Sequence, residues 1–360
     1  MQYRLSNKTI SELSCDYELC FVEGDKIENL EDKDVLELCK FGEGDVMDVP
    51  TSRRVYASLE DKDLESIRLV LAKVVSEIKG YKIKSLKTKL PVNDASIEDI
   101  YAAFVEGFEL SMYSFDKYKS DAEESTLDEL VLCEVSAADL ESAEKGLDRG
   151  LKIANATNYV RDIVNEIPQV YTPQKMAEDA KALTELEGVS CETFGKEYLK
   201  EQNMNAFLAV NQASPHDPVL LHMMYKPSGE SKGKYAFVGK GLPYDTGGLS
   251  LKPTRFMLTM KSDKGGAAAA LGVIKAVAEL KLPFEVHAVL GCTENAIGGK
   301  AYKPDDIIRT REGVTIEVTD TDAEGRLVLA DCLSWAQDMI KPDYIFDMAT
   351  LTGSISVGIG

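Results

Sequence analysis

Three short, glycine-rich segments of this chain place charged residues directly beside apolar runs. They read VGKGLPYDTGGLSLKP from Val238, MKSDKGGAAAALG from Met260 and TDTDAEGRLVLAD from Thr319. Apolar runs of this kind form the interior of a fold, so the charges at their ends lie at turns and not on solvated helix faces. A fold for this chain must therefore bring several charges to the ends of buried strands or helices, where chemistry can use them.

The stretches around these segments alternate between strand-like and helix-like patterns. We expect strands near 219–225, 234–239, 285–291, 314–318 and 344–348, and helices near 264–280 and 326–340. This alternation predicts an α/β fold in which helices flank both faces of a mostly parallel central sheet. Ligands gather at the carboxyl ends of the strands in such sheets. Lys240, Asp245 and Glu294 all follow predicted strands.

The rest of the chain predicts further α/β organisation. Residues 1–135 alternate short apolar runs with helical patterns and form an N-terminal α/β domain. Apolar residues at helical spacing predict a long connecting helix over 136–164, and a catalytic domain then follows over 165–360. From Ile345 to Gly360 the pattern predicts a strand, a turn and a second strand.

Composition narrows the class of protein. A net charge of −20 argues against nucleic acids and anionic membranes as partners. Seven cysteines without a CxxC pair indicate reduced thiols, and Cys292 and Cys332 lie in apolar, core-like runs. The N-terminus has no secretory pattern, and the longest apolar run, 265–280, is too short to span a bilayer. We therefore expect a cytoplasmic enzyme.

The charged segments are suited to holding two divalent metal ions. Two ions a few ångströms apart need several anionic oxygens, at least one of them shared, and four carboxylates are available here. Histidine is the usual nitrogen ligand of zinc hydrolases, but the three histidines show no HxxxH or HxH spacing. Lys240 is an alternative nitrogen donor, because a nearby dication and desolvation favour its neutral amine. The four carboxylates belong to Asp245, Asp263, Asp322 and Glu324.

Simpler interpretations of each segment remain open at this point. The glycines around Lys240 and Asp245 would suit a phosphate-binding loop, although the GxxxxGK[ST] order is absent. The DAEGR run would suit an ordinary helix start, with Asp322 as the cap and Arg326 solvated. The presence of all three segments in one chain favours catalysis over either explanation.

These segments closely resemble the signature of the leucyl aminopeptidase family, the M17 type of two-metal exopeptidases. Other matching segments are EGFELSMYSFDKYK from Glu106, RDIVNEIPQVYTP from Arg161, NAFLAVNQAS from Asn205, ENAIGGKAYKP from Glu294 and DMATLTG from Asp347. The resemblance extends from about residue 100 to the end of the sequence. It implies a cytosolic homohexamer of peptide catabolism that binds zinc or manganese.

The resemblance assigns a role to each charged position. Asp245 and Glu324 would bridge the two metals, Lys240 and Asp263 would complete the shell of one ion, and Asp322 that of the other. A hydroxide shared by the metals attacks the scissile carbonyl in this family. Lys252 and Arg326 match the catalytic positions, the first for the oxyanion and the second for a bicarbonate that serves as general base. We expect the substrate to contact Met260, Thr350, Leu351 and Gly353.

The chain also departs from the family pattern. Asp320 stands where the family usually has Asn, and Lys264, which follows Asp263, stands where it usually has Met. Lys264 thus adds a positive charge next to a metal ligand, which bears on substrate preference. Family members continue well beyond the position that matches Gly360, so we expect this sequence to lack the C-terminal part.

The sequence therefore predicts a metal-dependent aminopeptidase that releases N-terminal amino acids, leucine-like ones preferred, from peptides. Two alternatives remain open. A catalytically silent or truncated subunit with an assembly or regulatory role need not hold two ions. Phosphoesterase chemistry on a similar two-metal frame is disfavoured by the small number of basic residues near the site.

Overall fold

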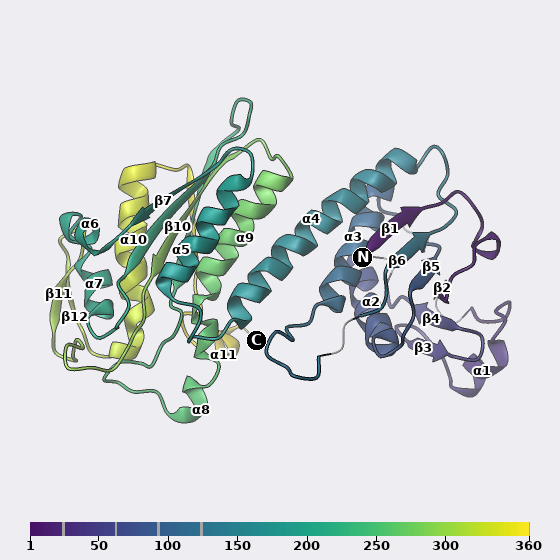
Figure 1. Cartoon of the computed structure of the whole chain (residues 1–360), viewed down its shortest axis with the longest axis horizontal. Coiled ribbons are helices and arrows are strands. Elements are labelled where there is room, and N and C mark those ends of the chain that lie inside the picture. Colours follow the sequence, from purple (N-terminus) through teal and green to yellow (C-terminus); the bar gives the residue numbers. More distant parts are fainter. Residues whose placement is uncertain (24–25, 62, 92–93, 123–124, 360) are drawn as a thin grey trace. The chain divides into compact units, whose positions relative to one another are not determined.

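The computed structural model describes residues 1–23, 26–61, 63–91, 94–122 and 125–359. The chain divides into two compact units, Met1–Asn158 and Tyr159–Gly360, each with its own sheet and core (Figure 1). The predicted division into domains 1–135 and 165–360, with a connecting helix between them, stays a prediction. Helix α4 runs from Leu140 to Asn165 and so belongs in part to each unit.

The first unit contains a six-stranded sheet that is parallel except at one edge. The strand order is β1-β6-β5-β2-β4-β3; the β3–β4 pairing is antiparallel, and the other described pairings are parallel. Short β-branched and apolar runs build these strands because alternate side chains reach the core. The strands are β1 (Gln2–Leu5), β2 (Tyr17–Val22), β3 (Val46–Val49), β4 (Arg54–Ser58), β5 (Ser85–Thr88) and β6 (Glu129–Leu132).

Helices α2 and α3 carry much of the apolar core of this unit. Each begins at a residue whose side chain accepts a backbone N–H: Asp63 accepts from Ser66 and Ser96 from Asp99. The apolar residues of α2 recur at intervals of three and four, so a single stripe of the helix is buried. The helices are α1 (Lys33–Leu38), α2 (Leu64–Ile78) and α3 (Ile97–Met112), with a 3-10 turn at Ile10–Glu12.

The second unit contains a five-stranded sheet of order β13-β9-β10-β8-β7. Strands β13, β9 and β10 are parallel to one another. Strand β8 pairs antiparallel with β10, and β7 pairs antiparallel with β8, so β7 runs in the same direction as the first three strands. The strands are β7 (Val189–Phe194), β8 (Val219–Tyr225), β9 (Lys234–Gly241), β10 (Glu285–Cys292) and β13 (Tyr344–Met348), and β11 (Ile307–Arg309) and β12 (Thr315–Glu317) form a separate hairpin.

Helices cover both faces of this sheet, as Figure 1 shows. Neighbouring strand residues point to opposite faces: Leu220 joins the cluster of α7 and α10, and Leu221 joins that of α5 and α9. The helices are α5 (Pro173–Ala182), α6 (Lys196–Glu201), α7 (Asn205–Asn211), α8 (Thr254–Met257), α9 (Gly265–Glu279), α10 (Glu324–Ile340) and α11 (Ile355–Gly358), with 3-10 turns η2 (Leu183–Glu185), η3 (Met260–Lys264) and η4 (Thr321–Ala323).

The predicted fold class is confirmed: two α/β units, the second with its sheet between layers of helices. The predicted strand at the end of the chain is wrong, because α11 forms there after β13. Ile355, Val357 and Ile359 are exposed, and no described strand pairs with this stretch. Local bonds such as that from the Gly358 N–H to the Ser354 carbonyl satisfy the backbone instead.

Cys292 and Cys332 are buried in the core, as their apolar surroundings indicated. Among the described residues, no helix combines the length and apolar character needed to cross a bilayer.

Candidate metal centre

The charged residues of the three glycine-rich segments meet at the carboxyl end of β9. Lys240 lies near the end of this strand, and Asp245 lies in the loop that follows it. Asp263 lies on the turn η3 that leads into α9. Asp322 and Glu324 lie on η4 and at the start of α10. In α/β sheets of this kind, ligands bind in the space outside the carboxyl ends of the parallel strands.

Lys240 is the buried centre of the first half of the site, with only 3% of its side chain exposed. Its Nζ lies 2.9 Å from Asp263 Oδ1, 2.8 Å from Glu324 Oε1 and 3.2 Å from the carbonyl oxygen of Thr350. All three donors of the ammonium group are therefore used. Burial by itself lowers the pKa of Lys240, but Asp263 and Glu324 together raise it above the ordinary lysine value.

Lys252 plays a corresponding part in the second half. Its Nζ lies 2.9 Å from Asp245 Oδ2 and also contacts the carboxylate of Asp322. Burial opposes the charge on Lys252, but the two carboxylates outweigh it and raise its pKa. Its side chain is more exposed than that of Lys240, at 14%.

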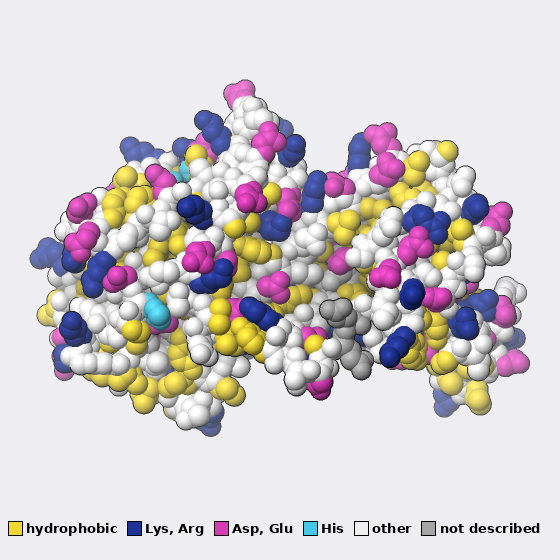
Figure 2. All heavy atoms as spheres, viewed as in Figure 1, with side chains coloured by type: hydrophobic (Ala, Val, Ile, Leu, Met, Phe, Trp, Pro, Cys, Tyr) yellow, Lys and Arg dark blue, Asp and Glu magenta, His cyan; other side chains and the backbone are white. Residues whose placement is uncertain are grey.

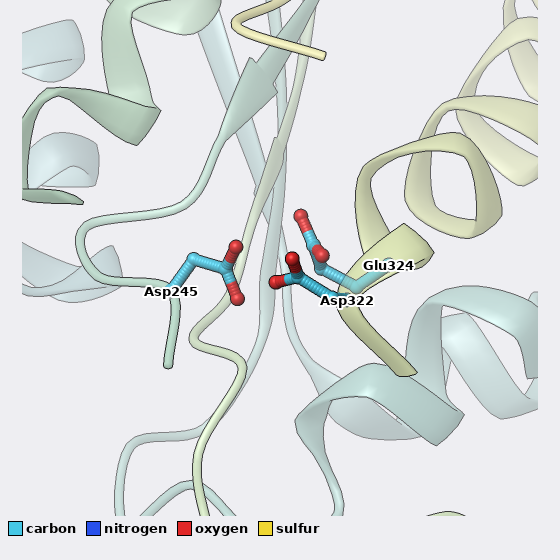
Figure 3. Close-up of side chains that lie close together, drawn as sticks. All are labelled: Asp245, Asp322 and Glu324. Atoms are coloured by element: carbon cyan, nitrogen blue, oxygen red, sulfur yellow. The ribbon is translucent and has the colours of Figure 1, made fainter. Parts of the chain in front are cut away.

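Asp245, Asp322 and Glu324 form a compact carboxylate cluster, and one oxygen of each lies within 4.8 Å of the others. Figure 3 shows Asp245 on the loop on one side and the other two at the start of α10, pointing toward one another. Asp245 is held in place because its Oδ1 accepts from the Gly247 N–H and from Asn295 Nδ2, at 2.8 Å each. This spacing suits oxygens that share cations.

The carboxylates hold more negative charge than the chain itself neutralises. Burial raises the pKa of Asp263 to about 6 and that of Glu324 to about 7, even though Lys240 opposes both shifts. Burial also raises the pKa of Asp322. Four carboxylates face two ammonium groups in these ion pairs, so two negative charges remain.

Two buried oxygens show where further positive charge fits. Asp263 Oδ2 and Glu324 Oε2 have no hydrogen-bond partner in the described part of the chain. Unpaired carboxylate oxygens cost free energy unless a cation or donor reaches them. The donor set of oxygens and one lysine nitrogen thus fits divalent metal ions.

Comparison with known proteins agrees with this geometry. The catalytic-domain profile of the cytosol aminopeptidase family matches residues 158–360, and its N-terminal-domain profile matches residues 59–122. The chain belongs to the cytosol aminopeptidase family. Its predicted relationship to the M17 type is confirmed, and with it the class of metalloexopeptidase, a hydrolase.

Individual relatives show how much of this chain they share. A probable cytosol aminopeptidase of Campylobacter jejuni is 50% identical over 100% of this chain and 75% of its own. One from Wolinella succinogenes is 44% identical over 88% of this chain and 66% of its own. The bottromycin maturation enzyme BotP, solved in complex with Mn, superposes with a TM-score of 0.83 at 28% identity, covering 96% of this chain and 75% of that one.

Of the other site residues expected from the aminopeptidase signature, Thr350 contacts this centre. Arg326 is exposed in the first turn of α10, two residues after Glu324. Met260 begins η3 and is partly buried, and Leu351 and Gly353 are exposed in the segment after β13. Thr350 reaches the centre directly, because its Oγ1 donates to Asp263 Oδ1 at 2.7 Å. The roles of all these residues stay predictions.

Sequence reasoning missed Asn295, which stabilises the site. Asn295 lies after β10, and its Nδ2 reaches both Asp245 Oδ1 and the carbonyl oxygen of Thr321. The sequence pattern indicated the preceding residue, Glu294, but its carboxylate accepts a hydrogen bond from the Ser214 hydroxyl. Glu294 and Asn295 show the same pattern in the sequence, a polar residue directly after a strand. Only the direction of the side chain in the structure distinguishes them.

Two glycines allow the charged side chains to approach one another. Gly247 has a φ of +85°, and a β-carbon there would lie 2.9 Å from Asp322 Oδ1. A β-carbon on Gly325 would lie 2.8 Å from Lys240 Nζ. The glycines of DTGG and DAEGR thus leave room for the site, which explains their place beside the charges.

Lys264 does not add its charge to the carboxylates, contrary to the expectation from its position in the sequence. Its Nζ contacts the carbonyl oxygens of Glu166, Val164 and Lys261 instead. Burial, assisted by nearby Lys261, lowers the pKa of Lys264 to about 8. The side chain points from η3 toward the end of α4.

Proposed function

We propose that this chain is a metal-dependent aminopeptidase that releases N-terminal amino acids, leucine-like ones preferred, from peptides. The observation that carries the proposal is the buried group of four carboxylates and two lysines at the end of β9, with two carboxylate oxygens left unpaired. Membership of the cytosol aminopeptidase family supports the same reaction.

Five residues would hold two divalent ions, with zinc or manganese favoured: Lys240, Asp245, Asp263, Asp322 and Glu324. When bound, such ions lower the pKa of water toward neutrality and polarise a carbonyl group. Lys240 would exchange its ammonium proton for the ion, because its two carboxylate partners are themselves ligands. The Mn in BotP's solved complex supports a divalent ion of this kind.

Lys252 is placed to stabilise negative charge that develops on the substrate. Its ammonium group has three donors, and two of them face Asp245 and Asp322. The third is available to an oxyanion beside the carboxylate cluster. The raised pKa keeps Lys252 charged at neutral pH, as this role requires.

Arg326 would hold a bicarbonate ion that acts as the general base. Arg326 is exposed two residues after Glu324, and a planar, permanently charged donor suits a small carboxylate-like anion. The free α-amine of a peptide would bind one of the two ions, which would confine cleavage to the first bond. Met260, Thr350, Leu351 and Gly353 would contact the first side chain of the substrate.

The whole protein is proposed to be a cytoplasmic homohexamer without nucleic-acid or membrane partners. The name of the cytosol aminopeptidase family supports the compartment, and the hexamer rests on the resemblance of the sequence alone. On the face seen in Figure 2, Lys and Arg side chains are interspersed with Asp and Glu and form no broad basic patch. Light scattering coupled to gel filtration would measure the number of subunits.

The proposal is tested by hydrolysis of leucine p-nitroanilide beside its N-acetylated form. Manganese or zinc is added and then removed with a chelator. We expect metal-dependent cleavage of the free-amine substrate alone. Cleavage of the acetylated form would exclude an exopeptidase that recognises the amine. Absence of cleavage with metals bound would favour a catalytically silent subunit, and phosphate release from model esters would favour a phosphoesterase.

A further inference from the structure

We propose that Lys264 and Lys261 together form a clamp that positions the metal ligand Asp263 by fixing turn η3 to the carboxyl end of helix α4. The proposal rests on the proposed function, since it concerns the same metal centre. It makes Lys264 and Lys261 positioning residues, because their ammonium groups bind the backbone carbonyls of residues 164–166.

The clamp consists of three hydrogen bonds from two ammonium groups to the backbone carbonyls of residues 164–166, and a fourth bond joins Lys264 to Lys261 within η3. Lys264 Nζ lies 3.1 Å from the carbonyl oxygen of Glu166, 3.4 Å from that of Val164 and 2.5 Å from that of Lys261. Lys261 Nζ lies 2.5 Å from the carbonyl oxygen of Asn165. Three consecutive carbonyl groups, of residues 164–166, are therefore bound by side chains of one turn.

These carbonyls need partners because α4 ends at Asn165. The last carbonyl groups of a helix have no N–H donor within the helix, and together they carry a partial negative charge. The ammonium groups of Lys261 and Lys264 supply the missing hydrogen-bond donors and also the positive charge that this helix end favours. The helix would otherwise need a glycine cap or water at this end.

Among the described residues Lys264 forms no ion pair with a carboxylate, although the nearby Glu166 carboxylate partly favours its charge. Its side chain is fully buried, and its Nζ lies 5.1 Å from the centre of the Tyr171 ring. A buried ammonium costs free energy unless donors are used and nearby groups compensate it. An apolar side chain of similar length would fill this space without that cost, so the charge serves the carbonyls.

Turn η3 connects this clamp to the metal centre. It comprises Met260–Lys264, and residues three apart in a 3-10 turn lie on the same side. Lys261 and Lys264 therefore face α4 together. Asp263 points away from them and contacts Lys240 and Thr350. Movement of the turn relative to α4 would displace the Asp263 carboxylate directly.

The test compares Lys264→Met, Lys261→Met and the control Lys275→Met in the full chain. Lys275 lies on α9 and pairs with Glu279, so its loss leaves η3 untouched. Manganese affinity is measured by competition with a chelator, and kcat and KM with leucine p-nitroanilide. We expect each clamp variant to weaken manganese binding by about tenfold to a hundredfold and to lower kcat with little change in KM. Lys275→Met should match the unchanged protein.

A dissociation constant for manganese within twofold of the unchanged protein in both clamp variants would overturn the proposal. A lower unfolding temperature with unchanged manganese affinity would overturn it as well, since the lysines would then only stabilise the fold. If Lys264→Met does not fold, Lys261→Met decides by the same criteria. Failure of the unchanged protein to bind manganese would instead refute the proposed function.

Discussion

The two units of this protein treat buried charge in opposite ways. Among the described residues of the first unit, the buried polar side chains are Ser58, Thr88 and Glu106, and the one carboxylate is paired with Arg68. In the second unit, the buried charged side chains are Glu166, Lys240, Asp245, Asp263, Lys264, Glu324 and Asp331. Similar α/β architecture thus surrounds an apolar core in one unit and a charged centre in the other.

The difference lies in how far the buried charges of each unit are paired. A buried ionic group costs several kcal/mol of desolvation unless its partners compensate it. For the buried Glu106 of the first unit the partner compensates this cost, because Arg68 Nε and Nη2 both reach Glu106 Oε2 at 2.7 Å. In the second, Asp263 and Glu324 keep unpaired oxygens and raised pKa values. Local departures from stable packing of this kind are expected at functional sites.

The largest effect is expected for Glu324→Gln. It removes one charge from the proposed ligand set, so we expect kcat/KM to fall on the order of a thousandfold, about 4 kcal/mol. Without metal, the same change should leave the free energy of unfolding unchanged or raise it, because burial disfavours the Glu324 carboxylate and raises its pKa to about 7. Steady-state kinetics with metal measure kcat/KM, and denaturant unfolding without metal measures the free energy of unfolding. Activity within tenfold of the unchanged protein would contradict a ligand role.

The next largest effect is expected for Gly325→Ala. The added methyl group would displace Lys240, whose Nζ lies 2.8 Å from the position of the new carbon. We expect kcat/KM to fall about tenfold to a hundredfold, although alanine is favoured over glycine in a helix by roughly 1 kcal/mol. Gly229→Ala is the matched control, because a β-carbon there meets no atom within 4 Å. Equal activity of the two variants would show that Lys240 needs no such space.

Glu106→Gln tests the first unit, and here stability should change while activity does not. Arg68 would lose a charged partner in a largely buried setting, which costs about 1 to 2 kcal/mol. Denaturant unfolding measures this loss, and hydrolysis of leucine p-nitroanilide provides the control. If activity fell together with stability, the contrast between the two units would not hold.

The smallest effect concerns histidine, since all three histidines lie in the second unit. Burial lowers the pKa of His287 below its ordinary value, with the opposing effect of Glu285 too small to restore it. The unfolded chain then binds the proton more readily, so stability is present above pH 6.5 and decreases as the pH falls below it. The free energy of unfolding is measured at pH 7.5 and 5.5 for His287→Gln and for the unchanged protein. The unchanged protein should lose more stability between these pH values than the variant, by less than about 1 kcal/mol. A steeper loss in the variant would have the wrong sign.

Much of the fold was accessible from local sequence patterns. The predicted strands around Val238 and Val289 and the predicted helices α9 and α10 are present, because hydrophobic periodicity depends on neighbouring residues. The end of the chain was not predictable in this way. Ile355 and Val357 are suited to a strand, but a strand requires a partner that the local sequence does not specify.

For the candidate site, too, local sequence predicts some features and long-range contacts decide the others. The types and spacing of Asp245, Asp322 and Glu324 favour a metal centre, because clustered carboxylate oxygens suit divalent ions. The support from Asn295 and the direction of Lys264 are not visible in the sequence. Both depend on contacts with residues far apart in the chain, Thr321 in one case and Glu166 in the other.

The sequence by itself thus determined which elements form, which residues carry the charge and which family the chain resembles. Hydrophobic periodicity and short motifs hold this information, since they act over a few residues. Only the tertiary structure decided how the charges are shared: Lys240 between Asp263 and Glu324, Lys252 between Asp245 and Asp322, and Lys264 on the end of α4. Distances between side chains distant in sequence decide these pairings, because electrostatic and hydrogen-bond energies depend on separation and burial.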